Sequence, residues 1–159
     1  MKFTLVKQSK LSGAKATVYT VKLSDGTDLF DQFLEENIGG YNEDVNDILK
    51  RLRSIATKTG AQEHFFKLHE GKPGDGVCAL YDTPNKHLRL YCIRMGNAVV
   101  IIGGGGPKKT RAYQEDPKLN HEANLLQEVS KVITDEMKAN NLRFSDDEME
   151  LKGEIIDHD

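Results

Sequence analysis

The order of apolar and polar positions divides the first part of the chain into a hairpin and two helices. Residues 3–23 alternate in hydrophobicity, which is typical of a hairpin or two strands. Asp25 and Gly26 turn the chain, and apolar residues then recur at helical spacing over residues 29–34. A second helical run follows Asn42, which is a favourable N-cap residue. We therefore expect a pair of helices over residues 28–58.

After Gly60 the apolar period shortens towards two, which predicts strands. Turn-forming residues separate four apolar runs, which cover residues 65–68, 77–81, 88–93 and 98–102. Short turns pair neighbouring strands, so we expect a largely antiparallel meander over residues 64–102. Four glycines and a proline at residues 103–107 then break the pattern, and helical spacing returns over residues 119–138.

These elements predict an α+β fold in which the helical pair packs on the antiparallel sheet and the helix at 119–138 closes one end. The 159 residues are 38% hydrophobic and include no tryptophan, which is ordinary for one globular domain. We expect a single domain over residues 1–140 with an extra N-terminal hairpin at 1–27. Residues 141–159 are expected to form a weakly packed acidic tail.

Composition also bounds the cellular setting and the chemistry. The first apolar run covers only residues 3–6, too few for a signal-peptide core or a membrane span, so we expect a cytoplasmic protein with no membrane partner. Cys78 and Cys92 lie fourteen positions apart, and the five histidines are scattered singly. No zinc-ligand spacing results, so we expect no metal or other cofactor and two reduced, buried thiols in neighbouring strands.

The net charge of −3 hides an uneven distribution. Residues 83–114 contain six lysines and arginines and no acid, a local charge of +6, whereas residues 141–159 contain seven acids and two bases. Charge acts over about 8 to 10 Å, so the local sum matters more than the total. We expect a basic surface, and a tail of opposite sign that competes with RNA for it. A merely solvated terminus is the more usual role of such a run.

The sequence GGGGPKKT at residues 103–110 has the composition of a phosphate-binding P-loop. Its register differs, because Lys108 stands where GxxxxGK[ST] requires glycine. A bend at which the backbone closely approaches another segment is the better interpretation.

Cationic and aromatic residues spread over the expected sheet suggest RNA chemistry. Cleavage of RNA without a metal needs a base for the 2′-hydroxyl proton, cations for the phosphorane-like transition state, and an aromatic face for a splayed base. A lone lysine or arginine is usually a solvated residue, and Tyr91 is more often a core residue. The set comprises Lys67, His69, Lys72, Arg89, Tyr91, Lys108, Lys109, Arg111 and Tyr113.

The segment HLRLYCIRMGNAVVIIGGGGPKKTRAYQ, residues 87–114, resembles the RelE superfamily, in particular its HigB-like, phage-derived branch. The similarity lies in a helical pair followed by strands, an arginine early in the penultimate strand, an aliphatic last strand and a KKT-like segment before a closing helix. FFKLHEGKPGDGVCALYD, residues 65–82, is similar to the strand that introduces the core of these toxins. The resemblance covers residues 28–138.

The resemblance implies a toxin of a toxin–antitoxin pair. Its activity would be that of a metal-independent, ribosome-associated mRNA endonuclease, and its partners would be mRNA on the ribosome and a small helix-turn-helix antitoxin. The family builds its site from residues on strands, which implies a catalytic set of Arg89, Lys109, Arg111 and Tyr113 with Lys67 or His69 as proton acceptor. The expected RNA-binding residues are Lys72, Lys86, Arg94 and Lys108.

Three departures from the family pattern keep alternatives open. Asp82 stands where many relatives have a basic residue, four glycines enlarge the expected turn before Lys108, and extra segments flank both ends. The family also contains inhibitors of DNA gyrase and members that only bind a partner, so the fold alone does not fix the chemistry. A non-enzymatic binding module and a plain interaction domain remain alternatives.

The catalytic hypothesis makes an expectation about two arginines. Arg89→Ala and Arg111→Ala should each preserve folding and relieve growth inhibition, because each removes positive charge from the transition state. Loss of one such donor typically slows a reaction by roughly a hundred- to a thousandfold.

Overall fold

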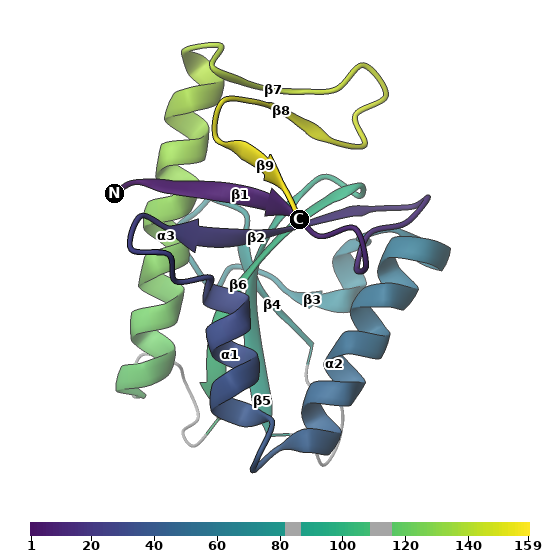
Figure 1. Cartoon of the computed structure of the whole chain (residues 1–159), viewed down its shortest axis with the longest axis vertical. Coiled ribbons are helices and arrows are strands. Elements are labelled where there is room, and N and C mark those ends of the chain that lie inside the picture. Colours follow the sequence, from purple (N-terminus) through teal and green to yellow (C-terminus); the bar gives the residue numbers. More distant parts are fainter. Residues whose placement is uncertain (82–86, 109–115) are drawn as a thin grey trace.

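The computed structural model describes residues 1–81, 87–108 and 116–159 (Figure 1). Its helical elements are α1 (Leu29–Asn37), α2 (Asn42–Ser54), a π-helical turn (Ile55–Thr59), a 3₁₀ turn (Glu63–Phe65) and α3 (Pro117–Lys138). Its strands are β1 (Phe3–Lys7), β2 (Thr17–Leu23), β3 (Phe66–Lys67), β4 (Val77–Leu80), β5 (Leu88–Met95), β6 (Val99–Pro107), β7 (Leu142–Phe144), β8 (Leu151–Gly153) and β9 (Ile156–His158). The fold is α+β, as expected.

A mixed seven-stranded sheet in the order β3-β4-β5-β6-β2-β1-β9 forms the centre of the molecule. Strands β3 to β6 pair antiparallel in chain order, which confirms the expected meander. The N-terminal hairpin β1–β2 is confirmed but is not an extra appendage, because β2 pairs parallel with β6. β9 adds a second parallel pairing, on β1. The sheet is therefore wider than the sequence predicted and not wholly antiparallel.

Helices cover both faces of this sheet, and side chains alternate between them along β5. Leu90 and Cys92 pack with α1 and α2, whereas Tyr91 and Ile93 pack with α3. The expectation that the last helix closes one end of the sheet is therefore wrong, because α3 covers the face opposite the helical pair. None of the helices in the described part of the chain combines the length and apolar composition that a membrane span requires.

Aspartates begin two of the helices. The Asp28 carboxylate caps α1 by accepting hydrogen bonds from the backbone N–H groups of Phe30 and Asp31, both at 3.0 Å. Asp116 caps α3 in the same way. The expected N-cap role of Asn42 is wrong, since Asn42 is already helical and the cap position, Tyr41, makes no side-chain capping bond.

The glycine segment, residues 103–106, continues β6 instead of forming a bend, which corrects the expectation that these residues end the strand pattern. A Cβ atom at Gly103 would lie 2.8 Å from the Leu126 side chain, and one at Gly104 would lie 2.5 Å from a Glu122 carboxylate oxygen. α3 therefore packs directly on the backbone of β6. The expected close approach of backbone to another segment is confirmed.

Residues 142–158 form three strands, so the expectation of a weakly packed tail is wrong. Leu142 and Leu151 are each only 1% exposed and belong to the core under α3. The backbone N–H of Leu151 donates to the buried Tyr19 hydroxyl at 2.8 Å. Lys7 on β1 pairs with Glu150 at 2.5 Å. Most of the acids of this segment are exposed, whereas Leu142 and Leu151 pack into the core.

The two cysteines lie directly opposite each other in the β4–β5 ladder and are both buried and unbridged, as expected. Burial raises the pKa of the Cys78 thiol to about 12, so this thiol stays protonated near neutral pH.

The packing of the C-terminal strands predicts a stability effect. Leu151→Ala should lower the free energy of unfolding by about 2 to 5 kcal/mol, because it leaves a cavity in the core. Glu154→Ala, at an exposed position of the same segment, should change it by less than about 0.5 kcal/mol. Urea unfolding followed by circular dichroism measures both. Equal midpoints for the two variants would mean that the segment is not part of the core.

Candidate functional site

The structure does not bring the expected site residues together. His69, Lys72 and Arg94 lie at one end of the β4–β5 pair, where Val77 is opposite Ile93. Lys108 lies at the other end, beyond the Leu88–Pro107 pair of β5 and β6. Six residues of extended strand separate these ends, roughly 20 Å. Four expected residues, Lys86, Lys109, Arg111 and Tyr113, lie outside the described residues, as does Asp82.

Arg89 is buried, which contradicts its expected place on an exposed basic surface. The residue is 2% exposed, and its Nη1 atom lies 3.0 Å from Oε1 of Glu70, which is itself 6% exposed. Lys67 was one of the two residues expected to accept a proton. Its ammonium group lies 3.7 Å from the same oxygen. Arg89 therefore neutralises a buried carboxylate within the fold.

Three of the expected site residues line a cavity of about 260 Å³ beside the β3–β4 connection: His69, Lys72 and Arg94. The backbone of His69 is in the left-handed region, with φ of 63°, which is uncommon for a residue other than glycine. Nε of Arg94 donates to the Ala61 carbonyl at 2.6 Å. The cavity is also lined by Glu63 and Asp75. These two carboxylates, beside Lys72 and Arg94, reduce the attraction of the cavity for phosphate.

Asp75 holds the loop that forms this cavity. Its carboxylate accepts from the backbone N–H groups of Lys72 at 2.7 Å and Val77 at 2.9 Å. A Cβ atom at Gly71 would approach that carboxylate to 2.4 Å, so glycine is required there. The charge of Asp75 thus serves the local structure of the loop.

The opposite end of the sheet presents Lys108 beside a residue that sequence reasoning missed, His87. The backbone N–H of Lys108 donates to the His87 carbonyl at 2.7 Å, which extends the β5–β6 ladder by one pair. Both residues are exposed. Directly opposite residues of antiparallel strands have Cβ atoms roughly 4.5 to 5.5 Å apart. His87 and Lys108 therefore occupy directly opposite positions at this end of the β5–β6 ladder.

The backbone of His87 is fixed from the helical layer. The carboxylate of Asp44 on α2, 7% exposed, accepts from the N–H of His87 at 2.5 Å and from that of Leu88 at 3.2 Å. The ring of Tyr41 lies with its centroid 6.1 Å from that of His87. No spacing in the sequence distinguished His87, because its position opposite Lys108 depends on the continuation of β6 through its glycines.

Lys118 brings a further cation to this end, since a Cβ atom at Gly106 would lie 3.4 Å from its side chain. The ammonium group lies 2.9 Å from Glu122 and 3.1 Å from Glu36. Desolvation opposes its charge, but the hydrogen bonds to Glu122 and Glu36 outweigh that effect and raise the pKa of Lys118. The pairing joins α1 to α3, so Lys118 is structural before it is a ligand for anions.

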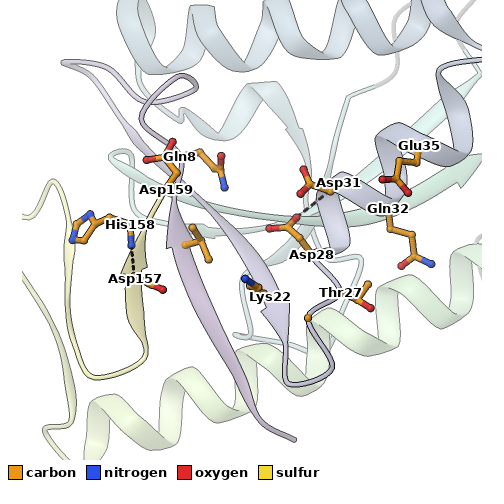
Figure 2. A pocket seen from close by; sticks show the side chains of 12 residues that line it. Gln8, Lys22, Thr27, Asp28, Asp31, Gln32, Glu35, Asp157, His158 and Asp159 are labelled. Carbon is orange, nitrogen blue, oxygen red and sulfur yellow. Dashed lines mark hydrogen bonds between the residues drawn. The ribbon is translucent and has the colours of Figure 1, made fainter.

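A cavity of about 740 Å³ between α1 and the C-terminal segment has the wrong charge for RNA. Figure 2 shows Asp28 and Asp31 at the start of α1, Glu35 in the last turn of α1, and Asp157 and Asp159 of the C-terminal segment among the side chains that line it. Desolvation, with the charges of Asp28 and Glu35, raises the pKa of Asp31. A phosphate backbone would be repelled from these carboxylates, and none of the expected site residues lines this cavity.

Within the described ranges, no group of three or more histidine, cysteine or acidic side chains is placed to hold a metal ion. No protein-family model matches the chain, and comparison with curated proteins and with solved structures likewise finds no match.

The burial of Arg89 changes the expected effect of its substitution. Arg89→Ala should lower the free energy of unfolding by about 3 to 5 kcal/mol, because it leaves Glu70 charged and buried with less compensation. The double variant Arg89→Met, Glu70→Leu should lie much closer to the parent, since it removes both charges. Urea titrations of the parent and both variants measure the effects. A single variant as stable as the parent would contradict the buried pair.

Proposed function

We propose that the protein is a RelE/HigB-like toxin that cleaves mRNA without a metal ion. Support comes from the antiparallel meander β3–β6 with the α1–α2 pair on one face, which agrees with the order of elements that the resemblance implies. The RelE-specific arrangement is part of the proposal, since the sheet also contains β1, β2 and β9.

One observation carries the activity: the exposed Lys108 at the end of the β5–β6 pair, beside His87. Lys108 belongs to the stretch of residues 83–114, which has a charge of +6 and no acid. RNA cleavage develops negative charge on a phosphate, and a cation at an accessible sheet end stabilises that charge. We propose mRNA on the ribosome as substrate and a helix-turn-helix antitoxin as partner.

The buried Arg89 favours a second candidate function. In RelE-like toxins the site is built from strand-borne cations, but Arg89 is 2% exposed and paired with Glu70. Without that arginine, the same surface could inhibit an enzyme such as gyrase or engage another protein by binding alone. This non-enzymatic module is the alternative.

Controlled expression with mapping of mRNA 5′ ends tests the proposal. The parent should inhibit growth and generate new 5′ ends within coding regions. Lys108→Ala should slow cleavage at least about tenfold, equivalent to about 1.4 kcal/mol of transition-state stabilisation. Lys131→Ala, which removes an exposed lysine of α3, is the matched control and should behave as the parent.

The possible results separate the candidates. Growth inhibition without new 5′ ends would favour the binding module. Neither growth inhibition nor new 5′ ends would refute the toxin proposal.

A further inference from the structure

We propose that His87 is the general base of this cleavage, accepting the proton of the attacking 2′-hydroxyl. The inference rests on the proposed function and assigns a role that neither Lys67 nor His69 fits. Lys67 lies 3.7 Å from the buried Glu70 carboxylate. His69 lies at the far end of the β4–β5 pair, roughly 20 Å from Lys108 by strand length.

The fold fixes the position of His87 while leaving its ring accessible. Asp44 is buried and accepts hydrogen bonds from two consecutive backbone N–H groups, those of His87 and Leu88. These bonds hold His87 and Leu88, the first residue of β5, against α2 without using the imidazole. The side chain is exposed at the end of the sheet. A general base needs both a fixed position and access to its substrate.

The neighbours of the ring suit a phosphodiester. Lys108 lies directly across the β5–β6 ladder and supplies positive charge. Tyr41, at the α1–α2 junction, places an aromatic ring at a centroid distance of 6.1 Å and an angle of 58° to the imidazole. Asp44 is the acidic group next to the histidine backbone. A base, a cation and an aromatic surface thus come from three separate elements.

The step balances without a metal. Neutral His87 takes the 2′-hydroxyl proton while the 2′-oxygen forms a bond to the adjacent phosphorus. The bond from phosphorus to the 5′-oxygen breaks, and that oxygen takes a proton from water. Lys108 stabilises the additional negative charge on the phosphate oxygens. The products are a 2′,3′-cyclic phosphate and a 5′-hydroxyl, and imidazolium returns its proton to solvent.

The experiment compares the parent with His87→Gln and His87→Ala on one RNA, tested free and on translating ribosomes, over pH 5 to about 9. His121→Gln, at an exposed position of α3, is the matched control. Loss of a general base typically costs about a hundred- to ten-thousandfold in rate. We expect that loss in both His87 variants. General-base catalysis uses the unprotonated form of the base, so we expect the rate to rise with pH in the parent and in His121→Gln, and we expect this rise to disappear in the His87 variants.

Urea unfolding is the control for correct folding of the variants. Both His87 variants keep the backbone N–H that donates to Asp44, so we expect both to fold. Product ends are identified by their sensitivity to a phosphatase that requires a terminal phosphomonoester, which a cyclic phosphate resists. A folded His87→Gln protein that cleaves within about threefold of the parent, with the same pH dependence, would overturn the inference while leaving the nuclease intact. A parent protein that cleaves no RNA in either format would instead refute the proposed function, and the role of His87 with it.

Discussion

The contact between α3 and the glycine segment of β6 is the constraint on which the rest of the structure depends. Residues 103–106 carry no side chains, so Leu126 and Glu122 of α3 lie against the strand itself. On the other side of the same ladder, a Cβ atom at Gly105 would collide with the Arg89 carbonyl of β5. β6 is thus in close contact with α3 through Gly103 and Gly104 and with β5 through Gly105. This packing keeps β6 extended as far as Pro107, and so determines where Lys108 and His87 meet.

Local patterns were sufficient to predict much of this fold. The 3.6-residue period predicted α1, α2 and α3, and the two-residue period with its turns predicted the β3–β6 meander. These signals depend on neighbours in sequence. The parallel pairing of β2 with β6 joins residues about eighty positions apart and leaves no periodic signature. The glycines suggested a bend because their preference for turns is strong, but strand and helix packing overrode it.

The candidate site was less predictable, because the charge of a residue in the sequence does not indicate whether its side chain is buried or exposed. Arg89 is one of the six lysines and arginines of the basic stretch, residues 83–114. Its side chain is nevertheless buried, because it pairs with Glu70, which lies nineteen positions earlier in the sequence. The burial of Leu142 and Leu151 was missed for a similar reason. Two leucines among seven acids hardly change the composition of the segment, so it was expected to be exposed. His87 had no distinguishing spacing at all. Its interest depends on the strand opposite it.

The parallel pairing of β9 with β1 has a consequence for synthesis of the protein. β1 precedes the other strands of this sheet in the chain and pairs with β2 on one side, but its neighbour on the other side, β9, is made after every other strand of the sheet. β2 similarly cannot form its parallel pairing until β6 has been made. Contacts between segments so distant in sequence form slowly, because a long loop must close before they contribute. The edges of β1 and β2 that pair with β9 and β6 therefore stay unpaired in the nascent chain until those strands have been made. The surface around Lys108 is complete only after α3 has been made.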